Sequence, residues 1–143
     1  MTRAVGLDLG SVRIGVATTD PGRIIASPYE VVTRGKDHAF DHASIAALVD
    51  DTQAALVVVG LPRSMSGKDG AAAQLIRAEV EELRAALRVP VLLWDERLST
   101  VTANRALIGG GVRRKQRKAT VDKVAAAVIL QSWLDAGAPE TVS

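Results

Sequence analysis

The sequence predicts an α/β fold with one five-stranded mixed sheet, a three-strand antiparallel meander plus two parallel strands, flanked by helices. Two patterns predict it. Three apolar segments near the start are joined by links too short for a helix, so they should pair antiparallel. Two later apolar segments each follow a segment of helical periodicity, and such crossovers make strands parallel. The chain has 143 residues, 48% of them hydrophobic, which suits a single domain over residues 1–143.

The meander comes first. Residues 4–9 and 13–19 are short apolar strands, and a strong turn signal, Asp-Pro-Gly, follows at residues 20–22. A third strand is expected near residues 24–33. Pro28 lies inside it and cannot donate a backbone hydrogen bond, which places this strand at a sheet edge or at a bulge.

The two crossover units follow. Residues 38–50 have the apolar spacing of a helix, and residues 54–59 form an uninterrupted apolar run typical of a buried strand. A second helix is expected over residues 71–87 and a fifth strand over 89–94. The residues expected on the inward face of that helix are Ala72, Leu75, Ile76, Val80, Leu83 and Leu87.

The last part of the chain is expected to be helical at both ends. One helix should start at the capping residues Ser99 and Thr100 and break at the three glycines 109–111. Residues 109–118 then read as a linker-like loop. A final helix is expected from Thr120 to Asp135, ending at Ala136 and Gly137.

The amino-acid composition limits the kinds of active site and metal site that the chain can form. The chain has no cysteine, which excludes disulfides, thiolate zinc sites and a cysteine nucleophile, and fits the reducing cytoplasm. Only two histidines are present, so any metal is expected to be Mg²⁺ or Mn²⁺ held by carboxylates. No apolar run is long enough to span a membrane, and the N-terminus lacks the layout of a signal peptide.

Asp8 is the first candidate site residue. It lies in an apolar strand between Gly6 and Gly10, where a carboxylate is costly unless a charged partner meets it, and a metal ion is a common partner. The alternative is that Asp8 caps the following turn. The pattern favours a metal ligand.

Asp95 and Glu96 are expected at the end of the fifth strand, where ligands bind in open sheets. Adjacent strand residues point to opposite faces, so only one of the two can face Asp8. The other is then a structural acid. Equally, both could be turn residues that pair with Arg97.

Asp122 shares a helical stripe with the apolar residues Ala125, Ala126, Ile129, Leu130 and Trp133. This spacing places it on the buried face. An acid in the first helical turn is also favoured by the helix dipole, but that benefit does not require the inward face. We therefore interpret Asp122 as a site acid. Three converging acids could bridge two hard cations, bind a phosphodiester and activate a water molecule.

The loop over residues 60–70 resembles a P-loop only superficially. Six residues separate Gly60 from Gly67 where the motif has four, and Asp69 replaces the Ser or Thr that binds Mg²⁺. Arg63 and Lys68 could still hold a nucleic-acid phosphate at this helix start. An ordinary glycine-rich helix entry is equally consistent with the sequence.

His38 and His42 are four residues apart, a spacing compatible with a metal site, but a solvated helix start explains them better. A basic run lies between the three glycines and Asp122, and could clamp a phosphate backbone or be a solvated loop. Only 3% of residues are aromatic, which argues against base stacking. The basic residues are Arg113, Arg114, Lys115, Arg117 and Lys118.

The sequence resembles the YqgF/RuvX family of bacterial Holliday junction resolvases and pre-16S rRNA-processing nucleases. Four motifs carry the resemblance, in family order and across nearly the whole chain. They are GLDLGSVRIGVA over residues 6–17 with Asp20, VGLP over 59–62 with Gly67, DERLST over 95–100, and Val121-Asp122 with the alanine and apolar pairs at 125–126 and 129–130. Ser99 stands where Thr is also common in the family.

The resemblance implies an RNase H-like fold related to RuvC resolvases and a two-metal phosphodiesterase site. By position, Asp8, Glu96 and Asp122 would be the metal ligands and Asp95 an accessory acid. Arg13 and Arg97, which lie in the same motifs, join the expected nucleic-acid contacts. Structured RNA or branched DNA would be the substrate, and the protein a monomer or a homodimer.

Two other functions remain open at this stage. A non-catalytic nucleic-acid-binding factor in ribosome maturation could keep the same fold. An actin-like or sugar-kinase-type phosphotransferase shares a similar first strand, but it normally needs a second lobe, for which 143 residues leave no room.

Overall fold

A computed structural model describes residues 2–63, 69–98 and 114–139, with the side chains of the last helix described from residue 124. It contains a five-stranded sheet in the order β3-β2-β1-β4-β5. The strands are β1 (Arg3–Leu9), β2 (Arg13–Thr19), β3 (Ala26–Thr33), β4 (Ala54–Leu61) and β5 (Val91–Asp95). The helices are α1 (His38–Thr52), α2 (Ala71–Ala86), the short 3-10 helix η1 (Glu96–Leu98) and α4 (Arg114–Asp135).

The strand pairing confirms the predicted fold class. β1, β2 and β3 form the antiparallel meander, and β4 and β5 join it in parallel through the crossovers that contain α1 and α2. Pro28 lies in the edge strand β3, next to the point where its register with β2 shifts. The edge position leaves room for a residue that cannot donate to a neighbouring strand.

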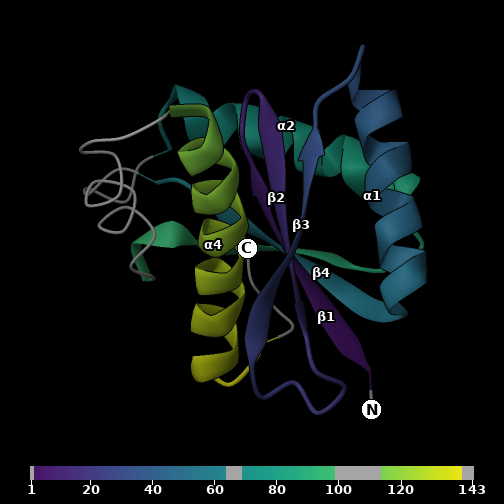
Figure 1. Cartoon of the computed structure of the whole chain (residues 1–143), viewed down its shortest axis with the longest axis vertical. Coiled ribbons are helices and arrows are strands. Elements are labelled where there is room, and N and C mark those ends of the chain that lie inside the picture. The colour runs from purple at the N-terminus through teal and green to yellow at the C-terminus, as the bar shows by residue number, and fades with distance from the viewer. Residues whose placement is uncertain (1, 64–68, 99–113, 140–143) are drawn as a thin grey trace.

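The sheet separates two apolar layers, visible in Figure 1 as α4 on one face and α1 and α2 on the other. Successive strand residues alternate between these layers. In β1, Val5, Leu7 and Leu9 pack with α1 and α2, whereas Ala4 packs with α4. Asp8 therefore belongs to the α4 face, because it lies an even number of residues after Ala4.

α4 approaches the sheet closely at Gly6. A Cβ atom at this position would lie 2.8 Å from Leu130 Cβ and 3.0 Å from the Ala126 carbonyl oxygen. The inward residues predicted for this helix are buried as expected from Ala125 onward, and Ala126 lets the two backbones approach. The small residues on both sides thus set how near α4 lies to β1.

The start of α4 corrects one prediction. The helix begins at Arg114, so most of the basic run predicted as a loop is helical. Arg, Lys, Gln and Ala all favour helices, which explains why the helix extends back toward the glycines. The helix predicted from Ser99, and the glycines 109–111, lie outside the described residues.

The inward face of α2 also differs from the prediction. Leu75 is 73% exposed, whereas Ala73 is fully buried. Ala72 is exposed as well, whereas Val80, Leu83 and Leu87 are buried as predicted, so the prediction fails only in the first turns of the helix. Leu75 was placed inward together with the other apolar residues of this helix, but a single exposed leucine is common on protein surfaces.

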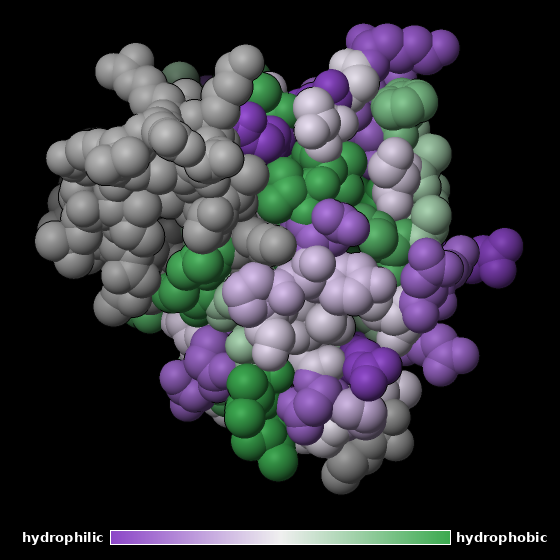
Figure 2. All heavy atoms as spheres, viewed as in Figure 1, coloured by the Kyte–Doolittle hydropathy of each residue, from purple (hydrophilic) through white to green (hydrophobic). Residues whose placement is uncertain are grey.

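The exposed surface is mixed. Figure 2 shows several hydrophobic groups set among hydrophilic and intermediate residues on the face it presents. The large apolar side chains with substantial exposure include Ile24, Ile25, Phe40 and Leu75. Within the described parts of the chain, no helix combines the length and apolar character needed to cross a membrane.

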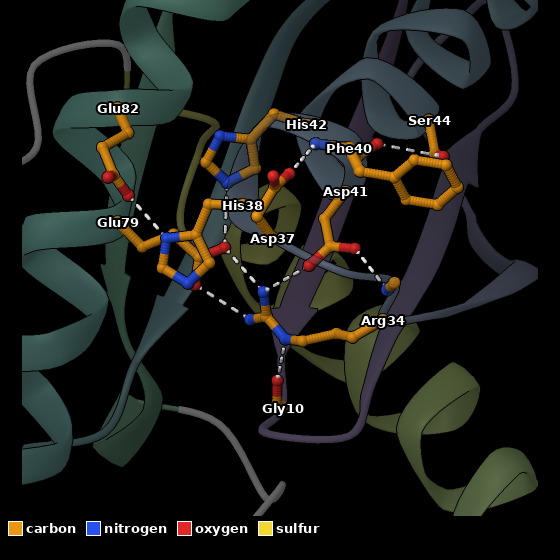
Figure 3. Close-up of polar contacts among 11 residues, drawn as sticks. Gly10, Arg34, Asp37, His38, Phe40, Asp41, His42, Ser44, Glu79 and Glu82 are labelled. Carbon is orange, nitrogen blue, oxygen red and sulfur yellow. Dashed lines mark hydrogen bonds and ion pairs between the residues drawn. The ribbon is translucent and has the colours of Figure 1, made fainter.

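A buried ionic network joins α1 and α2 to the turn between β1 and β2 (Figure 3). Arg34 donates from both terminal nitrogens to Glu79, at 2.8 and 2.9 Å. The same guanidinium reaches Asp41 at 3.2 Å, and its Nε donates to the carbonyl oxygen of Gly10 at 2.7 Å. One side chain therefore connects both helices to the residue two positions after Asp8.

The network favours the charged forms of Glu79 and Arg34. Burial by itself would raise the pKa of Glu79, but hydrogen bonds from Arg34 and His42 outweigh it and leave that pKa below its ordinary value. The hydrogen bond to Glu79 raises the pKa of Arg34. His42 is only 3% exposed, so the expected solvated helix start is wrong for this histidine. It is right only for His38, whose side chain is 51% exposed.

Replacing Gly6 by Ala should weaken the packing of α4 on β1. The added methyl group would lie too near Leu130 and Ala126, and overpacking of this kind costs about 1–3 kcal/mol. Urea unfolding should show this loss. Gly70→Ala is the matched control, because among the described residues no atom beyond the adjoining positions lies within 4 Å of its added Cβ, and its effect should stay within about 0.5 kcal/mol. Equal losses in the two variants would contradict the close approach at Gly6.

Replacing Arg34 by Met should destabilise the fold strongly, because it leaves Glu79 and Asp41 buried without their cation. Breaking a buried ion pair costs about 3–5 kcal/mol. In urea unfolding, Arg77→Met should cost less than about 1 kcal/mol, since its pair with Asp69 is more exposed. The network would lose its structural importance if the two variants unfolded at the same urea concentration.

Candidate active site

Asp8 lies near the carboxyl end of β1 and is 5% exposed. It faces the α4 side of the sheet, as Gly6 does. The chain turns immediately after it, with the Gly10 amide donating to the Asp8 carbonyl oxygen at 3.0 Å. The Nε of Arg34 donates a hydrogen bond to the carbonyl oxygen of Gly10. The backbone around this buried carboxylate is therefore fixed by hydrogen bonds at both ends of the turn.

Glu96 is the first residue of η1 and is 4% exposed. It was expected at the end of the fifth strand, but β5 ends at Asp95. Its carboxylate lies above Gly60, because a Cβ at Gly60 would be 2.9 Å from Glu96 Oε1. The same Cβ would lie 2.5 Å from Ile129 Cδ1 of α4. Glu96 is therefore on the α4 face of the sheet.

Asp8 and Glu96 approach the same part of this face. β1 and β4 are parallel neighbours, and Leu7 is paired with Val59. Asp8 and Gly60 each follow that pair by one residue, so Gly60 is adjacent to Asp8 across strands that lie about 4.8 Å apart. The structure thus brings two buried carboxylates from distant parts of the sequence to the carboxyl ends of parallel strands.

Asp95 has a different environment. Its carboxylate accepts hydrogen bonds from the side chain of Arg97, at 2.6 Å from one terminal nitrogen, and Arg63 lies 3.8 Å away. The hydrogen bond from Arg97 lowers the pKa of Asp95, against the opposing effect of burial. The reading of Asp95 as a turn residue paired with Arg97 is therefore correct as a description of its contacts. Glu96 differs from Asp95 in that its side chain is almost fully buried.

Asp122 lies in α4, one helical turn before Ala126, and its side chain is outside the described part of the helix. The helix runs antiparallel to β1. Gln131 accepts at 2.9 Å from the amide of Ala26, the first residue of β3, which is level with the start of β1 in the sheet, while Ala126 packs on Gly6. The turn of α4 that contains Asp122 therefore continues toward the Asp8 end of the strand.

The predicted nucleic-acid contacts are only partly described. Arg63 and Arg97 form ion pairs with Asp95, and Arg63 also pairs with Asp69 at 3.1 Å. Arg13 is half-buried at the start of β2. Lys68 and Arg113 lie outside the described residues. The remaining four belong to the first turns of α4, and their side chains are not described: Arg114, Lys115, Arg117 and Lys118.

Sequence reasoning missed the roles of Gly60 and of the Arg34 network. Gly60 was considered as part of a P-loop-like segment and of the VGLP motif, whereas its lack of a side chain makes room for Glu96. A glycine at the end of an otherwise apolar strand is a recognisable signal of close approach. The burial of Glu79 could also have been predicted, since this residue lies next to Val80 on the inward side of α2. No local pattern reveals its pairing with Arg34.

The donor set at this site suits a hard cation. Asp8 and Glu96 supply carboxylate oxygens, the ligands that Mg²⁺ and Mn²⁺ prefer. Both are buried on the same face, so a bound cation would offset the cost of bringing two carboxylates together. A further carboxylate from α4 could complete such a site, because that helix covers the same face.

Comparison with known proteins gives consistent results. Residues 2–136 match the family model RuvX, described as Holliday junction resolvase. A protein from Mycobacterium sp. (strain KMS) named "Putative pre-16S rRNA nuclease" is 48% identical over 134 residues, covering 93% of this chain and 79% of that protein. A protein of the same name from Rhodococcus opacus (strain B4) is 45% identical over 137 residues, covering 93% and 77%.

Two solved structures of RuvC share the fold. RuvC of T. thermophilus in complex with a Holliday junction substrate has a TM-score of 0.58 at 15% identity, covering 96% of this chain and 97% of that chain. A structure of Thermus thermophilus RuvC has a TM-score of 0.55 at 17% identity, covering 94% and 96%. These similarities confirm the RNase H-like architecture. On the family match and on relatives nearly half identical over most of their length, the chain belongs to the RuvX family.

Proposed function

We propose that the protein is a metal-dependent nuclease that hydrolyses phosphodiester bonds of structured nucleic acid. The observation that carries this proposal is the pair of buried carboxylates, Asp8 and Glu96, which lie on one face of the sheet around Gly60. Membership of the RuvX family and the RuvC-like fold support it. We include Asp122 as the third acid, since the course of α4 brings its turn toward Asp8.

In this mechanism, Asp8, Glu96 and Asp122 would hold two Mg²⁺ or Mn²⁺ ions. When bound, such ions activate a water molecule and stabilise the charge on the leaving oxygen. The residues of this chain supply the fixed geometry. Glu96 is positioned by the space at Gly60, and Asp8 by the hydrogen-bonded turn that follows it. Asp95 acts as an accessory acid that orients Arg97 beside Glu96.

We propose structured RNA or branched DNA as the substrate, acted on by a single nuclease domain in the cytoplasm. The relatives are named for pre-16S rRNA, the family is described as a Holliday junction resolvase, and one RuvC structure contains a Holliday junction. The basic residues at the start of α4 and around Asp95 would contact the phosphate backbone. Cutting a four-way junction needs two active sites, which favours a homodimer over a monomer on that substrate.

Asp8→Asn should lower the rate of cleavage by more than about 100-fold, because an amide cannot replace an anionic metal ligand. Cleavage of a four-way DNA junction and of a pre-16S rRNA fragment should be measured in Mn²⁺. Asp51→Asn makes the same chemical change at an exposed position of α1 and should cleave like the wild type. Thermal unfolding should show that both variants are folded.

Cleavage by Asp8→Asn at the wild-type rate would overturn the mechanism. If the wild-type protein binds both substrates but cleaves neither in Mn²⁺, the protein is a nucleic-acid-binding factor and the nuclease proposal fails. Chelation of divalent ions should abolish wild-type cleavage, and restored Mn²⁺ should return it.

A further inference from the structure

A second cluster of metal-ligating side chains lies on the opposite face of the sheet, between α1 and α2. It contains His38 and His42 of α1 and Glu79 of α2, each of which offers one ligand atom. These atoms all lie within 4.8 Å of one another. We propose that the three residues form a binding site for a divalent ion of the Zn²⁺ class, which would join the two helices. The proposal does not depend on the nuclease activity.

The backbone already places the ligands. His38 and His42 are four residues apart on one helix, so both rings project from the same side, and their centroids are 5.6 Å apart. His42 Nε2 lies 2.9 Å from Oε2 of Glu79, whose side chain extends from α2 toward α1. Ligand atoms around a tetrahedral Zn²⁺ lie about 3.3 Å apart. Only a modest movement of the exposed His38 is needed to complete the set.

The neighbouring residues would orient the ligands, as outer contacts do in zinc proteins. Glu82 lies 2.6 Å from His38 Nδ1, which leaves Nε2 of that ring for the ion (Figure 3). Arg34 holds the carboxylate of Glu79 through two hydrogen bonds. A carboxylate has lone pairs for more than two partners, so Glu79 can accept from Arg34 and still bind a cation.

The local charge favours a divalent cation. Among the described residues, Arg34 forms ion pairs with Asp41 and Glu79 of this cluster, and a third carboxylate, that of Glu82, contacts His38. Counted with both imidazoles neutral, as metal ligands must be, these groups carry two uncompensated negative charges. A Zn²⁺ ion would balance them. At His42, the ion would take the place of the hydrogen between Nε2 and Glu79.

The ligand types separate this site from the acids near Asp8. Imidazole nitrogen together with one carboxylate suits Zn²⁺, whereas sets of carboxylates suit Mg²⁺ or Mn²⁺. The location separates them as well, because Ile45 and Val49 of α1 belong to the apolar layer opposite α4. His38 is exposed, which gives an ion access from solvent, while Glu79 and His42 are buried.

The test is metal binding by the full-length, metal-stripped protein. Co²⁺ should give the strong visible absorption of a tetrahedral site, which octahedral carboxylate sites do not give, and Zn²⁺ should displace it at one equivalent. His38→Gln should weaken Zn²⁺ binding by about 10- to 100-fold or more in calorimetry. This variant should remain folded, because the side chain is largely exposed. Zn²⁺ should raise the unfolding temperature of the wild type but not of the variant.

Two controls make the result specific. Glu81→Gln changes an exposed acid on α2 next to the cluster and should bind Zn²⁺ as the wild type does. Asp8→Asn should keep the tetrahedral Co²⁺ band. Absence of that band in the wild type, its loss in Asp8→Asn, or equal Zn²⁺ affinity in the wild type and His38→Gln would each overturn the proposal. In the first case the cluster is an ionic network without a metal.

Discussion

The close packing of α4 against β1 is the constraint on which the candidate active site depends. Gly6 and Ala126 have the smallest side chains available, and together they let the helix backbone approach the strand. A larger residue at either position would lift α4 from the sheet. The acids on this face could then no longer be enclosed between the helix and the strands, and water would screen any charge that they share.

The same logic explains Gly60. The sheet could bury Glu96 only if the neighbouring strand left space for it, and Gly60 provides that space. Gly6 and Gly60 therefore both leave space on the α4 face of the sheet. Gly6 leaves space for the α4 backbone, and Gly60 leaves space for the carboxylate of Glu96. Strand propensity alone would disfavour both glycines, because neither adds a side chain to the core. The stability lost by placing glycine in these strands is explained if the site needs space at both positions.

Much of this arrangement could be predicted from sequence, because strands and helices leave periodic patterns. The strand pattern correctly placed Asp8 within β1, and the apolar stripe of α4 was correct from Ala125 onward. Patterns failed where the deciding contact is distant in sequence. Arg34 and Glu79 are 45 residues apart, and nothing near either residue indicates the other. The start of α4 was missed because a basic run was interpreted by its charge, not by its helix propensity.

The Arg34 network also relates the two faces of the sheet to each other. A guanidinium is rigid and planar, so its nitrogens cannot move independently. With two nitrogens fixed on Glu79 and Nε fixed on the Gly10 carbonyl oxygen, the position of α2 determines where the turn after Asp8 can lie. Helices on one side of the sheet thus help to position a carboxylate on the other. The geometry of the candidate active site is therefore a property of both layers, although its acids occupy only one.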